Sequence, residues 1–159
     1  MSGSLRFNLD PFGDHDDAIL NDALQRSGLG AIRHAESGTA TPQRLTLDFQ
    51  IAAGGGNLSQ GQRQLVALAR ALVRQSKVLI LDEATASVDF ETDALIQQSI
   101  RDLPDSTTVL TVAHRLATVM DYDKILVLGK GKLIEYDSPE ALKSNPDSYF
   151  AKLVQAMEG

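Results

Sequence analysis

Two apolar runs separated by an amphipathic stretch limit this chain to a small set of folds. The first run covers Val78–Leu81 in "KVLILDEATASVD", and the second lies in the β-branched stretch "TTVLTVAH". Runs without alternation are typical of parallel strands that are buried on both faces. Between them, "DFETDALIQQSIRDL" has apolar residues at helical spacing. The sequence therefore predicts a strand, helix, strand crossover in an α/β domain with a mostly parallel sheet flanked by helices.

The remaining periodic segments predict helices and one hairpin. From Ser59 to Gln75 the apolar residues recur at helical spacing, and "DDAILNDALQRSG" has acidic residues at its start and Gly28 at its end. The stretch "KILVLGKGKLIEYD" predicts a C-terminal β-hairpin. We also expect a short helix near residues 116–120, a helix beginning at Ser138 and Pro139, and a last helix over residues 149–157. Residues 30–44 read as a surface loop.

Composition excludes several classes of protein. A length of 159 residues predicts one domain, and the formal charge of -6 disfavours proteins that bind a nucleic-acid backbone. The chain has no cysteine, so it has neither a disulfide framework nor a thiolate metal site. No apolar run approaches the roughly 18 residues of a membrane helix, and the N-terminus does not resemble a signal peptide. We therefore expect the isolated chain to be soluble and to reach a membrane only through partner domains.

Three polar residues follow the predicted strands where ligands of α/β sheets bind. Asp82 and Glu83 come directly after the first strand, and His114 follows the second. Asp82 suits a Mg²⁺ ion held through water, and Glu83 is placed to polarise an attacking water. His114 could contact a phosphate from the same edge. Each of these residues also has a structural explanation when it is considered alone. Asp82 and Glu83 could form a solvated acidic turn, and His114 could be a structural histidine.

The stretch "NLSQGQ" lies between three glycines and the long amphipathic helix. Ser59 is a typical N-cap, Gly61 permits close approach of the backbone, and the free N–H groups of a helix start favour an anion. Polyphosphate is the ligand that suits such a site. A capped helix with a flexible entry is the structural alternative, and the order of the motifs along the chain argues against it.

That order resembles the ATP-binding cassette family. "LSQGQ" at residues 58–62 is similar to its signature motif, "VLILDE" at 78–83 to Walker B, "SVD" at 87–89 to the D-loop, and His114 to the switch histidine. "GSLRFNLDPF" and "MDYDKILVLGKGKLIEYDSPEAL" resemble the C subfamily, the multidrug-resistance-associated type. The chain is thus identified as the C-terminal part of a second nucleotide-binding domain, a partial ATPase domain over residues 1–159.

The resemblance implies a role for each residue, with ATP and Mg²⁺ as the ligands. Asp82 would assist Mg²⁺, Glu83 would polarise the hydrolytic water, His114 would contact the γ-phosphate, and Asp89 would communicate across a pair of domains. Ser59 and Gly61 would contact the γ-phosphate of a nucleotide held by the opposite domain. Gln60 and Gln62 belong to the same nucleotide-binding motif, in which Gln60 replaces the more common glycine.

The sequence contains no G-x-x-x-x-G-K-[ST] phosphate loop. We expect the chain to begin just after the Q-loop of the family, and therefore to form an incomplete P-loop NTPase domain that is inactive alone. We also expect an exposed sheet edge and apolar surface. In the complete protein, a second nucleotide-binding domain and transmembrane domains would be the partners, at the cytoplasmic face of a membrane.

Two other functions share some of these features. One is a truncated, non-catalytic module that docks onto an intact cassette domain through its signature face. The other is a soluble cassette ATPase of DNA repair or chromosome structure. The acidic charge and the "NLDPF" and "MDYDKILVL" stretches argue against the second.

Overall fold

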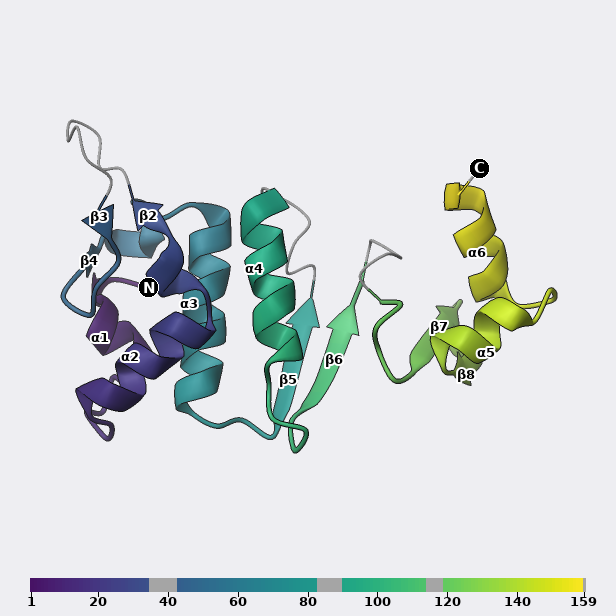
Figure 1. The fold of residues 1–159 in the computed structure, drawn as a ribbon, viewed down its shortest axis with the longest axis horizontal. Helices are drawn as coiled ribbons and strands as arrows, with labels where there is room; N and C mark the ends of the chain where they lie inside the picture. The colour runs from purple at the N-terminus through teal and green to yellow at the C-terminus, as the bar shows by residue number, and fades with distance from the viewer. Residues whose placement is uncertain (35–42, 83–89, 114–118, 159) are drawn as a thin grey trace. The chain divides into compact units, whose positions relative to one another are not determined.

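The computed structural model describes residues 1–34, 43–82, 90–113 and 119–158. The chain divides into two compact units, Met1–Thr111 and Val112–Gly159 (Figure 1). The helices of the first unit are α1 (Leu5–Leu9), α2 (Asp17–Arg26), η1 (Leu29–Ala31), η2 (Ala53–Gly55), α3 (Gln60–Val73) and α4 (Phe90–Arg101). Its strands are β1 (Gly3–Ser4), β2 (Arg33–His34), β3 (Gln43–Arg44), β4 (Gln50–Ile51), β5 (Val78–Asp82) and β6 (Thr108–Val112), whose last residue belongs to the second unit.

Helix α2 forms where the acidic start predicted it. The Oδ1 atom of Asp16 caps the helix by accepting from the N–H of Ile19 at 3.0 Å. Asp17 in the first turn is also paired with the guanidinium of Arg6 in α1. Gly28 follows the helix at φ 76°, a left-handed conformation that ends helices. Capping and this terminal glycine therefore define both ends of α2.

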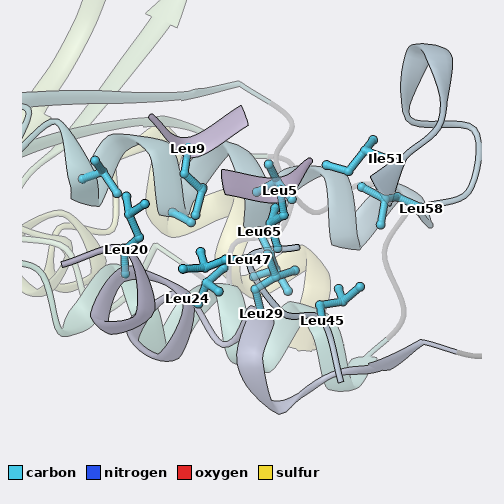
Figure 2. Packing of buried hydrophobic residues seen from close by; sticks show 14 of the residues in the cluster. Leu5, Leu9, Leu20, Leu24, Leu29, Leu45, Leu47, Ile51, Leu58 and Leu65 are labelled. Carbon is cyan, nitrogen blue, oxygen red and sulfur yellow. The ribbon is translucent and has the colours of Figure 1, made fainter. Parts of the chain in front are cut away.

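The core of the first unit is built around helix α3. Leu65, Val66 and Ala69 on its buried face are inaccessible to solvent, and they pack with leucines from α1, α2 and the segment before α3. Figure 2 shows this packing, with Leu5, Leu9, Leu20 and Leu24 among the labelled side chains. Burying one such leucine contributes about 1.5–3 kcal/mol. The helical stripe predicted from the sequence is therefore the centre of this unit.

The first unit contains two short antiparallel pairs, of which the first connects the N-terminal segment to the segment before α3. Strand β1 pairs with β4, with Gly3 opposite Ile51, and β2 pairs with β3. The N–H of Leu5 donates to the carbonyl of Phe49 at 2.8 Å, so backbone from the segment before α3 satisfies the start of α1. Helix α1 itself is absent from the sequence-based predictions.

The predicted strand, helix, strand crossover is confirmed as β5, α4 and β6. The two strands lie side by side and point the same way (Figure 1), and the N–H of Thr108 donates to the carbonyl of Lys77 where both strands begin. The prediction that these strands are buried on both faces is wrong. Val78, Ile80 and Leu110 are 59%, 65% and 54% exposed, because within the described residues nothing covers their face. This face is the exposed apolar surface that the sequence led us to expect.

The second unit contains the predicted hairpin. Strands β7 (Ile125–Gly129) and β8 (Lys132–Asp137) pair antiparallel, with Gly129 opposite Lys132. The two turn residues, Lys130 and Gly131, both have positive φ, at 51° and 75°. Two-residue turns with two positive φ angles match the right-handed twist of the strands. The predicted helix near 116–120 falls mainly on residues outside the described ones, and residues 119 and 120 lie in a turn.

Two helices complete the second unit, α5 (Pro139–Ser144) and α6 (Tyr149–Glu158). Ser138 caps α5 as predicted, and Leu142, Phe150 and Val154 form a small core with Val119. The carboxylate of Glu135 in β8 caps α6. It accepts from the N–H groups of Tyr149 and Phe150, at 2.7 and 3.1 Å, and from the hydroxyl of Ser148 at 3.0 Å.

This cap makes the stability of α6 depend on pH. Burial alone would raise the pKa of the Glu135 carboxyl, but the hydrogen bonds from Tyr149, Phe150 and Ser148 lower it below the ordinary 4.5. Because the folded pKa is depressed, the stabilisation is present above 4.5 and is lost as the pH falls through the lower folded pKa.

We predict that Glu135→Gln increases hydrogen exchange of the α6 amides at neutral pH and flattens their pH dependence in the acidic range. The matched control is Glu140→Gln, which removes the same charge from an exposed side chain in the first turn of α5. Equal exchange in the two variants would contradict the capping role of Glu135.

Candidate functional site

The N-terminus of α3 is a fully formed capping box. The N–H of Gln62 donates to the Oγ of Ser59 at 3.1 Å, and the N–H of Ser59 donates to the Oε1 of Gln62 at 2.9 Å. Such reciprocal bonds satisfy two of the donors that a helix start leaves open. The predicted cap by Ser59 is therefore confirmed, and the Gln62 side chain is shown to hold the backbone of Ser59.

Two donors at this helix start remain open. The N–H of Arg63 bonds the carbonyl of Ser59 at 3.0 Å, whereas no described residue accepts from the N–H groups of Gln60 and Gly61. Ser59 and Gln60 are exposed, whereas Gly61 is buried, so an anion can reach this end at Ser59 and Gln60. The helix dipole adds a partial positive charge at the same place. The geometry therefore provides backbone donors for an anionic group, as the sequence predicted.

The segment before α3 is fixed by side chains that the sequence analysis did not identify. The Nδ2 of Asn57 donates to the carbonyl of Gln50, and its Oδ1 accepts from the N–H of Ala52, both at 2.8 Å. Leu58 and Ile51 are 5% and 4% exposed and project into the core (Figure 2). The entry to α3 is thus an ordered loop rather than a flexible one.

Asp82 is the last residue of β5 and is exposed. Helix α3 and strand β5 run in opposite directions, so Asp82 and the start of α3 lie toward the same end of the unit (Figure 1). Among the described residues, no hydrogen bond or ion pair joins Asp82 to Ser59. An exposed carboxylate at a strand end suits a hydrated Mg²⁺ ion.

The other predicted site residues, Glu83, Asp89 and His114, lie outside the described residues. The described part of the chain contains no group of three histidine or acidic side chains that could hold a metal ion. The structure thus describes the positions of Ser59, Gln60, Gly61, Gln62 and Asp82, and the binding and catalytic roles of all the site residues stay predictions.

Three side chains that shape the start of α3 were not assigned these roles from the sequence: Gln62, Asn57 and Arg63. Only the role of Gln62 could have been recognised from a sequence pattern. A serine followed three residues later by glutamine at a helix start is the pattern of a capping box, and it would have indicated the role of Gln62. Asn57 and Arg63 make hydrogen bonds to loop carbonyls, which hydrophobic periodicity does not report.

An open groove of about 590 Å³ lies elsewhere on the first unit, between α2, the end of α3 and the turn before β6. It contains none of the predicted site residues. Across the described ranges, the helices are too short or too polar to span a lipid bilayer.

Comparisons with known proteins identify the family that this chain resembles. Residues 13–86 match the family described as ABC transporter. The chain is 53% identical over 154 residues to multidrug resistance protein mrp-7 of Caenorhabditis elegans, covering 97% of this chain and 10% of that protein. It is 54% identical over 142 residues to ATP-binding cassette sub-family C member 3 of Homo sapiens, covering 89% of this chain and 9% of that protein.

A solved structure gives the same result for the fold. The whole chain superposes on 27% of a bacterial Atm1-family ABC exporter with ATP bound, with a TM-score of 0.81 and 26% identity. The chain spans about a tenth of the length of the curated relatives it matches. It therefore belongs to the ATP-binding cassette transporter family, and over most of its length it is similar to the family's C subfamily.

Proposed function

We propose that residues 1–159 form the C-terminal part of the second nucleotide-binding domain of an ABC transporter, in which ATP hydrolysis drives transport across a membrane. The observation that carries this proposal is the start of α3, where Ser59 caps the helix and no described residue accepts from the N–H groups of Gln60 and Gly61. Backbone donors at a helix start suit a phosphate group. The similarity to C-subfamily transporters supports the same assignment.

The signature residues serve a nucleotide held by the opposite domain. In this proposal the Ser59 hydroxyl and the backbone at Gly61 contact the γ-phosphate of that nucleotide, with the neighbouring N–H of Gln60. The Oγ of Ser59 already accepts from the N–H of Gln62, so its own hydrogen is available for donation. Gln62 acts by orienting Ser59, because its carboxamide oxygen holds the Ser59 backbone.

Asp82, the last residue of β5, and Glu83, the next residue in the sequence, serve this domain's own nucleotide. Asp82 would hold Mg²⁺, and Glu83 would take a proton from the water that attacks the γ-phosphate in line. When bound, Mg²⁺ neutralises charge on the phosphates. His114 contacts the γ-phosphate, and Asp89 contacts the opposite domain. The exposed carboxylate of Asp82 at a strand end fits this assignment.

The partners are a second nucleotide-binding domain and the transmembrane domains of the transporter, at the cytoplasmic face of a membrane. Closure of the paired domains around ATP would couple hydrolysis to substrate movement. Since the sequence has no G-x-x-x-x-G-K-[ST] loop, the α- and β-phosphates need a cradle from another segment. We propose that the 159 residues alone do not hydrolyse ATP.

A second function is favoured by the same lack of a phosphate loop and by the exposed face of β5 and β6. In it the chain is a non-catalytic module that docks onto an intact cassette domain through the signature end of α3.

One measurement distinguishes the two functions: Mg²⁺-dependent ATP hydrolysis. It is measured for the chain by itself and for the chain mixed with a fragment that carries a phosphate loop and Q-loop from a related domain. Hydrolysis by the mixture but not by the chain by itself supports the ATPase proposal. Silence in both, with the chain shown to be folded, supports the docking module.

We predict that Ser59→Arg weakens ATP-dependent pairing with a related, complete cassette domain by about 10–100-fold, because a long cation replaces a small donor at the phosphate site. Sedimentation at varied ATP concentration measures the pairing. Ser59→Ala removes the cap without adding a charge, so it separates the loss of the cap from the effect of the added cation. Losing the cap costs about 1 kcal/mol of stability. The control Ala67→Arg adds the same charge on an exposed part of α3 and should pair normally. Normal pairing by Ser59→Arg would exclude the signature assignment.

We predict that Glu83→Gln in the chain mixed with the complementary fragment lowers turnover by about 10²–10⁴-fold while ATP binding is retained, because the variant loses the general base. Single-turnover hydrolysis and nucleotide binding are measured on the same sample. Glu140→Gln, at an exposed position of the second unit, controls for the loss of one charge. Retained hydrolysis would remove Glu83 from the role of base.

A further inference from the structure

Arg63, in the first turns of α3, reaches back over the loop that precedes the helix. Its Nη1 atom donates to the carbonyl of Leu58 at 2.9 Å and to the carbonyl of Gly55 at 3.3 Å. Both acceptors lie in the segment that leads to Ser59. The side chain is half-buried, so its guanidinium is directed at the loop and is partly shielded from water.

The peptide group between Leu58 and Ser59 is held at both ends. Its carbonyl, from Leu58, accepts from Arg63, and its N–H, from Ser59, donates to the Oε1 of Gln62. Two consecutive helix residues thus hold one peptide plane. This plane directs the Ser59 backbone, and with it the Ser59 hydroxyl, at the start of α3.

The stem of Arg63 also packs against the loop. Gly55 has φ 76°, and a Cβ atom built there would lie 2.9 Å from the Cδ of Arg63 and 3.4 Å from its Cγ. Gly54, one residue earlier, has a similar φ of 68° but nothing within 4 Å of such a Cβ. The two glycines share the same backbone requirement, and only Gly55 leaves room for Arg63.

We propose that Arg63 is a positioning residue for the signature site: it orients Ser59 and the open N–H groups of Gln60 and Gly61 without touching nucleotide. The expected effect of Arg63 on ATP-dependent pairing rests on the proposed function. Its expected effect on the loop rests only on the contacts described above. The Asn57 bonds to Gln50 and Ala52 fix the base of the same loop, so Arg63 acts on a segment that is already anchored.

The first test is hydrogen exchange of the whole chain, comparing the amide of Ser59 with amides in the interior of α3. We expect Arg63→Ala to speed exchange at Ser59 by about tenfold, the effect of losing the hydrogen bond to the carbonyl of Leu58 in the same peptide group, while residues 65–73 keep their rates. Arg63→Lys should retain part of the protection, because one nitrogen makes both bonds. Unchanged exchange at Ser59, or an equal increase throughout α3, would overturn the proposal.

The second test compares Gly55→Ala with Gly54→Ala. Both substitutions strain a left-handed backbone, but only Gly55→Ala also displaces the Arg63 stem. We expect faster Ser59 exchange in Gly55→Ala than in Gly54→Ala, and no such difference when Arg63→Ala is present in both. Equal exchange in the two glycine variants of the wild-type background would contradict the contact.

The third test measures ATP-dependent pairing with a related, complete cassette domain. Arg63→Ala should raise the ATP concentration for half-maximal pairing by about tenfold, with Arg63→Lys intermediate. Unchanged pairing by Arg63→Ala would overturn the positioning role. If the wild-type chain does not pair at all, the proposed function fails, whereas the exchange measurements still decide whether Arg63 fixes the loop.

Discussion

The packing of α3 against the N-terminal helices is the interaction on which the first unit depends. A helix of 14 residues is marginal by itself in water, so the buried face that contains Leu65, Val66 and Ala69 is what stabilises it. This packing also fixes the direction of the helix. Ser59 and Gln60 are therefore held at the surface, and the capping box of Ser59 and Gln62 leaves the N–H groups of Gln60 and Gly61 without an acceptor among the described residues.

An acidic chain can offer an anion site because the donors belong to the backbone. The formal charge of -6 disfavours broad contact with phosphates, yet the start of α3 supplies N–H groups and a helix dipole without needing a cationic surface. Arg63, which lies beside this helix start, donates to the carbonyls of Gly55 and Leu58. Recognition of a γ-phosphate would therefore rely on the orientation of the backbone, and the loop contacts of Asn57 and Arg63 set that orientation.

Much of the fold is predictable from local sequence. The helical stripe of α3, the acidic start of α2 and the hairpin turn at Lys130 and Gly131 each carry a local signal, and each is confirmed. The position of strand β5 was predicted correctly, but its burial on both faces was not. An apolar run indicates a strand, but it does not indicate which other segments cover each face of that strand. Helix α1 was missed because its five residues are too few for a periodic pattern.

The site was predictable in part. Ser59 could be identified as a cap because capping depends on neighbours in sequence, and the structure confirms it. Arg63 and Asn57 were missed because their hydrogen bonds depend on how the loop folds back, which no spacing encodes. Glu83, Asp89 and His114 remain predictions from the resemblance and from their order along the chain.

The central claim is that the open N–H groups at the start of α3 bind the γ-phosphate of a nucleotide held by another domain. The most direct measurement is the amide NMR spectrum of the ¹⁵N-labelled chain, titrated with an unlabelled, related cassette domain in the presence of Mg²⁺ and a non-hydrolysable ATP analogue. We expect shifts at the amides of Gln60 and Gly61 that disappear when ADP replaces the analogue. Equal shifts with ADP, or shifts elsewhere but none at these two amides, would contradict it.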